Sequence, residues 1–426
     1  MELKKYKLGE ILDVTRGASL SGEFYATEGE YIRLTCGNFD YQNNCFKENK
    51  SKDNLYYTGD FRSEFLMEKG DIITPLTEQA IGLLGSTAII PENGKYIQSQ
   101  DVAKIICKED LLDKDFAFYL ISSTLVKQQL SAAAQQTKIR HTSPDKIKDC
   151  TVWIPELAEQ KRISKLLRSL DCKIELNRVI NQNLEAMAKQ LYDYWFVQFD
   201  FPNEEGMPYK SSGGKMVWNE KLKRKIPEGW SASNICMISD ILSGGTPSKA
   251  SSQYWENGTI LFFGPTDYNG NIFQIETADH ITQDGLTHCT SSLFEEGVII
   301  ITARGSIGKQ VIIGTPMAMN QSCYALRSKT GEYEYLYFLT IQLIECLKAK
   351  ASGSVFKSII ASDIENSLLC IAESSIITRF CESVRPFLQK IKENIIEISN
   401  LTKQRDELLP LLMNGQVSVN SDLSDD

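Results

Sequence analysis

The sequence has 426 residues, of which 42% are apolar and 24% are charged, and its formal net charge is −9. This is the composition of an ordinary globular protein with room for two or three hydrophobic cores. The excess of acidic residues argues against a protein that coats nucleic acid unaided, because non-specific binding relies on an excess of Lys and Arg that meets phosphate.

Residues 1–154 are predicted to form a first globular domain of mixed α/β or mainly β class. A strand pattern occurs at Tyr31-Ile32-Arg33-Leu34, and another at Asp71-Ile72-Ile73-Thr74 after the turn signal Glu68-Lys69-Gly70. A helix with Phe116 and Leu120 on one side follows. The domain ends with a strand-like run at 150–154.

Residues 155–199 are predicted to form one long helix. Pro155 suits the first helical position, no Pro or Gly interrupts the stretch, and Pro202 supplies a stop. Residues on one side recur at alternating spacings of four and three, the 3.5-residue period of a coiled-coil seam. The seam comprises Ile163, Leu167, Leu170, Ile174, Asn177, Asn181, Leu184, Ala188, Leu191 and Trp195.

Residues 200–230 are rich in Pro, Gly, Ser, Asn and Lys and are predicted to be a surface linker. Residues 231–371 then repeat the plan of the first domain. Ile260–Phe263 takes the place of the first strand, and Gly297–Thr302 corresponds to Gly70–Thr74. The loops between these framework positions differ. Because loops on a rigid frame carry recognition, the pattern favours two readers of different ligands, although duplication followed by drift is an alternative.

Residues 372–416 are predicted to form a second long helix, followed by a tail at 417–426. Its seam comprises Phe380, Val384, Phe387, Ile391, Asn394, Ile398, Leu401, Arg405, Leu408 and Leu412. Asn394 lies 217 positions after Asn177, and the same offset relates Leu401 to Leu184. The chain therefore reads as a tandem repeat rather than two unrelated amphipathic helices.

The predicted fold is α+β: two α/β domains separated by two long antiparallel helices that form an intramolecular coiled coil with an approximate two-fold axis. Because Asn177 and Asn394 lie near the midpoints of their seams, we expect them to be close together. Polar residues in a seam fix its register at some loss of stability.

No run of eighteen apolar residues and no basic-then-apolar start is present, so we expect a cytoplasmic protein that is neither secreted nor membrane-spanning. The eleven cysteines are never spaced Cys-x-x-Cys, which favours reduced thiols over disulfides or a zinc site. Three histidines leave little for metal or acid–base chemistry, and we predict no metal site.

Catalytic motifs are missing as well. The sequence has neither a phosphate-binding loop of the Gly-x-x-x-x-Gly-Lys-Ser/Thr type nor the Asn/Asp-Pro-Pro-Tyr/Phe motif of an amino-methyltransferase. Asp145 with Glu159 and Lys161 superficially matches a metal-dependent nuclease pattern. Such enzymes need these groups to converge from adjacent strands, whereas Glu159 and Lys161 fall in the first turns of a long helix. We therefore predict no catalytic residues.

Candidate ligand-reading residues lie in loop-like, Gly-flanked or basic positions. Their side chains are mostly those that pair with base edges or phosphate. Each is about as likely to be plain surface. The candidates are Arg16, Gln79, Lys138, Arg140 and His141 in the first domain, and Thr246, Lys249, Arg304, Ser306, Lys309 and Lys357 in the second.

The order of domains and helices resembles the specificity subunit of type I restriction-modification systems. The motifs that carry the resemblance span the chain: Pro155–Gln160, Leu191–Phe196, Tyr209–Met216, Ile226–Trp230, Gly244–Pro247 and Ala303–Gly308. The second helix departs from the family pattern, because Ala372–Arg379 stands where a Pro-Pro-Leu-x-Glu-Gln-like opening is expected. Pro386 is expected to kink this helix early.

The resemblance implies a non-catalytic DNA-reading subunit. Each globular unit would be a target-recognition domain that reads one half of a bipartite site in double-stranded DNA. The helices would set the spacing and dock two modification (methyltransferase) subunits, and restriction subunits would join through the complex. No cofactor is expected in this chain, whereas its partners are expected to use S-adenosylmethionine, ATP and Mg. The alternative is a non-enzymatic coiled-coil adaptor whose globular ends bind proteins.

Overall fold

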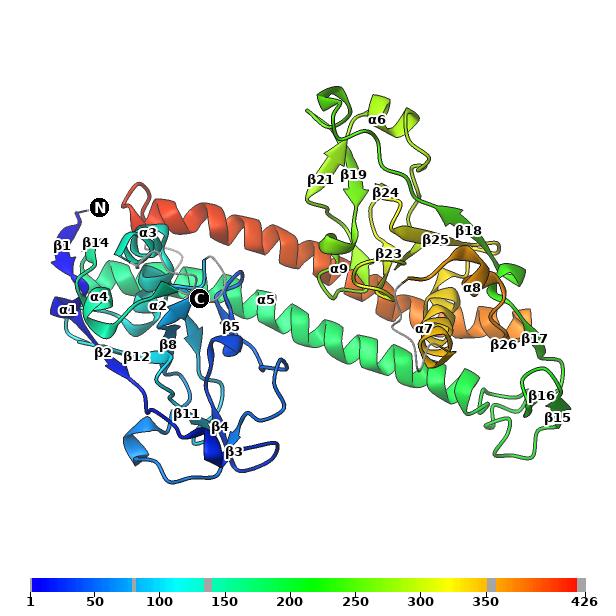
Figure 1. Cartoon of the computed structure of the whole chain (residues 1–426), viewed down its shortest axis with the longest axis horizontal. Coiled ribbons are helices and arrows are strands. Elements are labelled where there is room, and N and C mark those ends of the chain that lie inside the picture. Colours follow the sequence, from blue (N-terminus) through cyan, green and yellow to red (C-terminus); the bar gives the residue numbers. More distant parts are fainter. Residues whose placement is uncertain (1, 79–81, 134–139, 351–357, 420–426) are drawn as a thin grey trace. The chain divides into compact units, whose positions relative to one another are not determined.

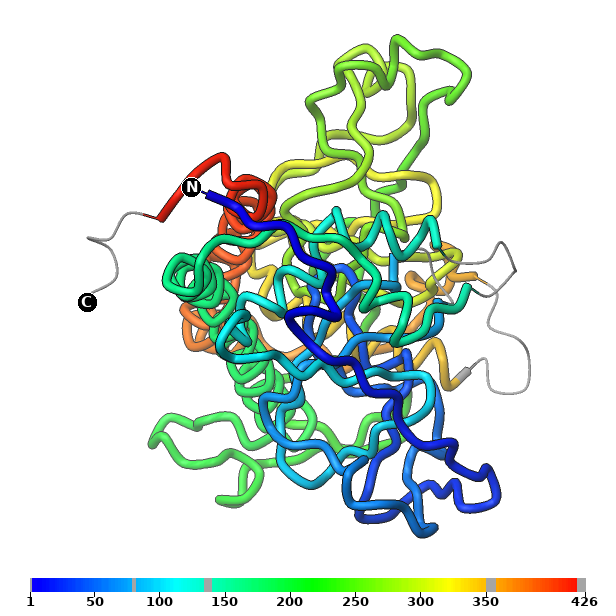
Figure 2. Tube along the Cα trace, turned by 90° about the vertical axis from the view of Figure 1, so that its left-hand side faces the viewer, coloured from blue at the N-terminus to red at the C-terminus, as the bar shows by residue number. Residues whose placement is uncertain are grey.

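A computed structural model describes residues 2–78, 82–133, 140–350 and 358–419 (Figures 1 and 2). The chain divides into two compact units. Unit 1 comprises Met1–Lys173 and Leu401–Asp426, and unit 2 comprises Ile174–Asn400. Each long helix therefore contributes one segment to each unit.

Unit 1 is built on two four-stranded sheets, and the predicted mixed α/β class is confirmed. The first has the order β10-β8-β12-β2 and is antiparallel throughout; the second has the order β11-β4-β7-β3. The first sheet contains β2 (Leu12–Arg16), β8 (Ile72–Pro75), β10 (Ala88–Ile89) and β12 (Val102–Cys107). The second contains β3 (Tyr25–Ala26), β4 (Tyr31–Arg33), β7 (Tyr56–Tyr57) and β11 (Tyr96–Ile97).

Three strand pairs complete unit 1. They are β1 (Lys4–Lys7) with β14 (Thr151–Ile154), β5 (Phe39–Asp40) with β6 (Cys45–Phe46), and β9 (Thr77–Glu78) with β13 (Arg140–His141). The short helices are α1 (Leu8–Ile11), α2 (Lys114–Ser122), α3 (Thr124–Ala133) and α4 (Pro144–Lys148). Asp113 caps α2, because its carboxylate accepts a hydrogen bond from the Phe116 N–H at 2.9 Å.

The core of unit 1 includes both long helices. Phe116 of α2 is fully buried in one apolar cluster with Ile105 of the sheet, Ile163 and Leu167 of the first long helix, and Leu412 of the second. Full burial of such a side chain contributes about 1.5–3 kcal/mol. The globular part and the two helix segments therefore share one core.

Unit 2 contains a five-stranded sheet of order β18-β25-β22-β23-β20 and a three-stranded sheet of order β21-β19-β24 (Figure 1). The five strands are β18 (Ser239–Ser243), β20 (Phe273–Gln274), β22 (Ile299–Thr302), β23 (Gln310–Ile313) and β25 (Cys323–Ser328). The other sheet holds β19 (Ile260–Phe263), β21 (Asp279–Ile281) and β24 (Met317–Met319). Two further pairs are β15 (Met216–Asn219) with β16 (Arg224–Pro227) and β17 (Ser231–Ser233) with β26 (Leu369–Ile371).

The helices of unit 2 are α6 (Gln283–Thr287), α7 (Tyr333–Lys350) and α8 (Ala361–Glu365), together with its segments of the long helices. An aromatic cluster joins them. Phe380 is fully buried, and its ring lies 5.0–6.0 Å, centroid to centroid, from four other rings. These are Tyr192, Trp195, Phe196 and Phe338.

The long helices are α5 (Leu157–Tyr192), which continues into a π-helical turn at Asp193–Val197, and α9 (Ser374–Met413). Gln160 ties the start of α5 to α2, because its side chain accepts from the Asp113 N–H at 2.9 Å and donates to the Leu111 carbonyl at 3.0 Å. The expected disturbance at Pro386 does not interrupt α9. Pro386 is exposed, and buried neighbours such as Leu388 hold the helix in place.

In unit 2, the segments of α5 and α9 run antiparallel. Asn394 Nδ2 donates to Asn181 Oδ1 at 2.8 Å, and Asn177 Nδ2 donates to Glu397 Oε2 at 2.8 Å. Asn177 and Asn394 therefore lie within about one helical turn of each other but are not direct partners, because Asn394 pairs with Asn181 and Asn177 with Glu397. All twenty seam residues are buried or half-buried in their units.

The segment 200–230 is more structured than its composition predicted. It contains the hairpin β15–β16, and Asp200 accepts hydrogen bonds at 2.7 Å from both the N–H and the hydroxyl of Ser211. Phe201 stacks on Trp230 with ring centroids 5.2 Å apart, and both rings are buried in the core of unit 2. Within the described ranges, no helix is long and apolar enough to cross a membrane.

Candidate functional site

One edge of the first sheet of unit 1 gathers three of the predicted reading residues. β2 ends at Arg16, opposite Ala103, and β8 ends at Pro75, opposite Val102. The strand pair β9–β13 follows directly after β8 and places Arg140 opposite Glu78. Arg16, Arg140 and His141 therefore share this edge.

Hydrogen bonds hold these side chains against the turn that precedes β12. Arg16 Nε donates to the Gln100 carbonyl at 2.8 Å, and the Thr77 hydroxyl donates to Asp101 Oδ1 at 3.3 Å. His141 Nδ1 lies 3.4 Å from the same Thr77 hydroxyl oxygen. Arg16 and His141 are exposed, which leaves their remaining donors open to a ligand.

Arg140 is already engaged within the protein. Its Nη1 lies 3.5 Å from Glu78 Oε2 and donates to the Ser131 hydroxyl at 3.0 Å. Glu78 is buried and accepts the Gly82 N–H at 2.8 Å, so it anchors Arg140 rather than contacting a ligand. Gln79 and Lys138 lie outside the described residues.

The corresponding edge of unit 2 lies where β22 ends at Thr302, opposite Cys323, and β18 ends at Ser243, opposite Tyr324. The Thr246 hydroxyl donates to the Gln321 side chain. The Thr302 hydroxyl donates to the Ser306 carbonyl at 2.5 Å and shapes the loop after β22.

The predicted reading residues of this loop are solvent-accessible. Arg304, Ser306 and Lys309 are all exposed, and Lys309 Nζ lies 5.4 Å from the centroid of the Tyr268 ring. Lys249 Nζ lies 5.8 Å from the ring of Trp255, on a separate loop of unit 2. Lys357 lies outside the described residues.

The two edges share a backbone frame. Leu76 N–H donates to the Asp101 carbonyl at 2.8 Å in unit 1, and Ala303 N–H donates to the Ser322 carbonyl at 2.7 Å in unit 2. The next pairs also match: Thr142 N–H to the Leu76 carbonyl and Ile359 N–H to the Ala303 carbonyl, both at 2.9 Å. The frame is repeated, whereas the side chains that it presents differ.

A glycine stands at the same point of each frame. A Cβ on Gly17 would lie 2.2 Å from the Gln98 carbonyl oxygen, and a Cβ on Gly244 would lie 2.0 Å from that of Asn320. Any larger residue would push the two chain segments apart. This close approach fixes the turns on which the candidate residues lie.

The donors at these edges suit recognition rather than catalysis. Arg, Lys, Ser, Thr and His present N–H and O–H groups that pair with base edges and phosphate. Among the described residues, no group of three His, Cys, Asp or Glu side chains could hold a metal ion. Glu159 lies 2.8 Å from Arg162 on α5, while Asp145 lies on α4 and is exposed, so they do not form a nuclease centre.

Sequence reasoning missed an apolar surface at the end of α5. A groove of about 750 Å³ lies here, and Met187, Leu191, Tyr194 and Phe387 are among its lining residues. Met187 is 51% exposed, and nearby Val197 is 43% exposed. The seam pattern considered only the side of α5 that faces α9. Met187 of α5 and Tyr194 of the π-helical turn are apolar residues on the outer side of the helix, and their presence there is the sequence signal that would have indicated this surface.

Comparisons with known proteins agree with one another. Residues 1–186 and 227–371 match the family model described as Type I restriction modification DNA specificity domain. The chain is 27% identical over 329 residues to the Type I restriction enzyme MjaIX specificity subunit of Methanocaldococcus jannaschii, covering 75% of this chain and 73% of that protein. It is 23% identical to the Type I restriction enzyme HindI specificity subunit of Haemophilus influenzae, covering 97% of this chain and 99% of that protein.

A solved structure shares the fold. The Type-I restriction-modification system S subunit from M. genitalium aligns with a TM-score of 0.62 at 17% identity, covering 97% of this chain and 96% of that one.

Proposed function

The chain belongs to the type I restriction-modification DNA specificity family, whose specificity subunits are non-catalytic, and from this premise we propose that it selects a bipartite DNA target for a type I restriction-modification complex. The globular part of each unit reads one half-site in duplex DNA. The observation that carries this proposal is the repeated frame at the two sheet edges, which presents different donors in each unit.

Recognition of DNA bases by these two sheet edges is compatible with the net negative charge of the chain. Exposed Arg16 and His141 in unit 1, and Arg304, Ser306 and Lys309 in unit 2, give a small set of donors. A small set favours contacts with base edges over broad neutralisation of phosphate. Affinity of the chain for random DNA should therefore be weak, and partner subunits should supply further contacts.

The long helices provide the distance between the two half-sites. In this proposal α5 and α9 form an intramolecular antiparallel coiled coil with an approximate two-fold axis. The pairs Asn181–Asn394 and Asp171–Arg405 support this, because each joins the two helices within its own unit and both follow the antiparallel order. Two modification subunits dock on the helices, and the apolar groove at Met187 and Tyr194 offers one contact surface.

The chemistry belongs to the partners. The modification subunits would use S-adenosylmethionine, and the restriction subunits would use ATP and Mg. This chain would contribute no cofactor of its own and would act by positioning DNA.

Binding to duplex DNA, with and without the methyltransferase partner, tests the proposal. Replacing Arg304 with Ala should weaken target binding by about 1–3 kcal/mol if Arg304 reads a base. Lys329 is a matched control. It follows the last residue of β25, at the opposite end of that strand from the reading edge, and its side chain donates to the Cys236 carbonyl. Replacing Lys329 with Ala should leave binding unchanged. A protein adaptor would show no target-specific DNA binding with either subunit composition.

A further inference from the structure

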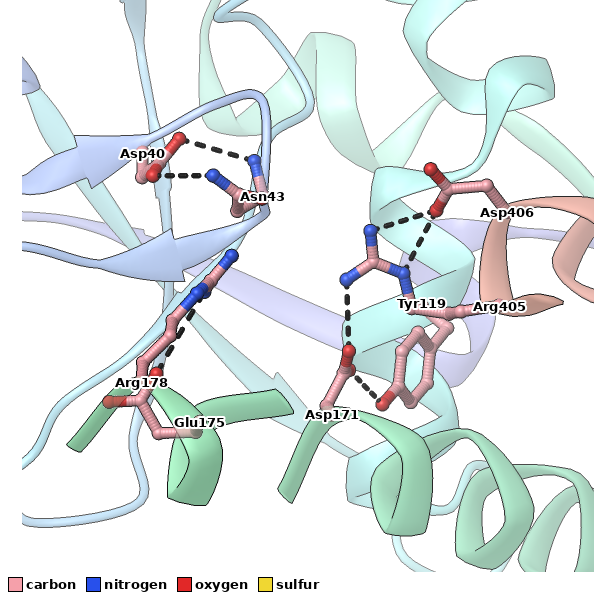
Figure 3. A network of polar contacts seen from close by, with 8 residues as sticks. All are labelled: Asp40, Asn43, Tyr119, Asp171, Glu175, Arg178, Arg405 and Asp406. Atoms are coloured by element: carbon pink, nitrogen blue, oxygen red, sulfur yellow. Dashed lines mark hydrogen bonds and ion pairs between the residues drawn. The ribbon is translucent and has the colours of Figure 1, made fainter. Parts of the chain in front are cut away.

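A polar network joins three elements inside unit 1 (Figure 3). Arg405 of α9 donates from Nη1 to Asp171 Oδ1 of α5 at 2.9 Å, and the Tyr119 hydroxyl of α2 donates to Asp171 Oδ2 at 2.5 Å. Asp406 receives the other side of the guanidinium, at 2.9 Å from Nε and 2.8 Å from Nη2. The Asp171 carboxylate therefore accepts hydrogen bonds both from α2 of the globular part and from α9, the opposite long helix.

The network is largely buried. The side chain of Arg405 is 10% exposed and that of Asp171 is 21% exposed. Burial and the adjacent Asp171 carboxylate raise the pKa of the Tyr119 phenol, so its hydroxyl stays protonated and remains a donor. Both oxygens of Asp171 are consequently occupied by directional partners.

Unit 2 has apolar residues at the same three positions. The offset of 217 that relates the seams places Leu388 at the position of Asp171 and Ala188 at that of Arg405. Aligning Leu120 of α2 with Leu339 of α7 places Phe338 at the position of Tyr119. All three counterparts are buried: Leu388 and Ala188 are 0% exposed and Phe338 is 2% exposed.

An ion pair that does recur supports this alignment. Arg168 of α5 lies 3.2 Å from Asp115 of α2, and the corresponding Arg385 of α9 lies 2.6 Å from Glu334 of α7. The link between a long helix and the globular part is therefore common to both units. The Tyr–Asp–Arg network is a feature of unit 1 alone.

Stability alone does not account for the difference. A buried ion pair generally stabilises a protein no more than apolar side chains of similar volume, and unit 2 packs such side chains at these positions. The polar network of unit 1 additionally imposes a defined geometry on the elements that it joins. Apolar contacts tolerate small shifts and rotations, whereas hydrogen bonds and a planar guanidinium fork require one geometry.

We propose that Tyr119, Asp171 and Arg405 are positioning residues that fix the orientation of the recognition part of unit 1 on its two helix segments and thereby make target binding selective for one spacer length. This inference rests on the proposed function and adds the residues that enforce its spacing. In unit 2, the polar pairs Asn181–Asn394 and Arg385–Glu334 remain unchanged and serve as an internal reference.

The test variant gives unit 1 the residues of unit 2: Tyr119→Phe, Asp171→Leu and Arg405→Ala together. The chain with its methyltransferase partner is titrated against duplexes that carry the methylated target, with the natural spacer and with one base pair added or removed. The wild type should lose about tenfold in affinity when the spacer changes. The triple variant should bind the natural target within about threefold of wild type and discriminate between spacers by less than about threefold.

A matched control, Asp115→Asn, weakens the more exposed pair with Arg168 between α2 and α5 and should keep the wild-type spacer profile. If the triple variant unfolds, Arg405→Lys keeps the charge without the fork and should still relax spacer discrimination. A folded variant with the wild-type profile would overturn the inference. Failure of the wild type to bind the target would instead reject the proposed function.

Discussion

Lengthening both long helices by one heptad should lengthen the unread spacer of the target. Asn181 bonds to Asn394 and to the Ile391 carbonyl, so residues 175–181 of α5 and residues 392–398 of α9 form facing heptads. The lengthened protein carries a tandem duplication of each of these two heptads.

The size of the effect follows from helix geometry. Seven residues add roughly 10 Å at about 1.5 Å per residue, and the seam stays in phase because the insertion is one full heptad. With base pairs about 3.4 Å apart, this corresponds to about three base pairs of rise. Tilt between the helices and the duplex, and the turn of the groove, reduce the expected gain to about one to three base pairs.

Methylome sequencing of a strain that carries the lengthened protein measures the new spacer, and both half-sites should stay the same. Duplication of residues 175–181 in α5 alone serves as the control. The added heptad then has no facing heptad in α9, so the free energy of unfolding should fall. Full activity with an unchanged spacer in the facing design would refute the idea that these helices set the distance.

Three further predictions concern unit 2. Replacing Phe380 with Ala should lower the free energy of unfolding by about 3–5 kcal/mol, because a fully buried ring among four others is lost. Urea titration measures this change, and a decrease below about 1 kcal/mol would contradict the described packing of Phe380. Replacing Pro386 with Ala should raise stability by about 1–3 kcal/mol, since Pro386 is an exposed residue inside a continuous helix; a loss of stability would contradict that account. Burial raises the pKa of the Glu185 carboxyl to about 7, so its contribution to stability is complete below the ordinary pKa and is lost as pH rises through 7. Urea titrations from pH 5 to 8 should therefore show that Glu185→Gln loses less stability than wild type over this interval.

The long helices could be predicted because their signals are local and repeated. An uninterrupted stretch after Pro155, a 3.5-residue period and a shared offset define α5 and α9 to within a few residues at most boundaries. The pairing register could not be predicted in the same way. Periodicity defines which side of a helix is buried but leaves a choice of turns, and the polar bonds of Asn181 and Asn177 select among them.

Composition predicted the segment 200–230 less well. Its Pro, Gly and Ser residues are typical of a linker, yet Phe201 and Trp230 anchor it in the core of unit 2. Likewise, Arg405 could be placed in the seam from its spacing, whereas its partners Asp171 and Tyr119 depend on tertiary packing that no local pattern encodes. The reading residues also remain predictions, because loop sequence indicates which donors are present but not which base each would meet.

The central claim is that each globular part reads one half of a bipartite DNA target. Its most direct test is to exchange residues 231–371 for the matching segment of a relative with a different target and to map methylated sites across the genome. The account predicts that one half-site changes to that of the relative while the other half-site and the spacer stay the same. A change in both half-sites, or in neither, in an active complex would contradict it.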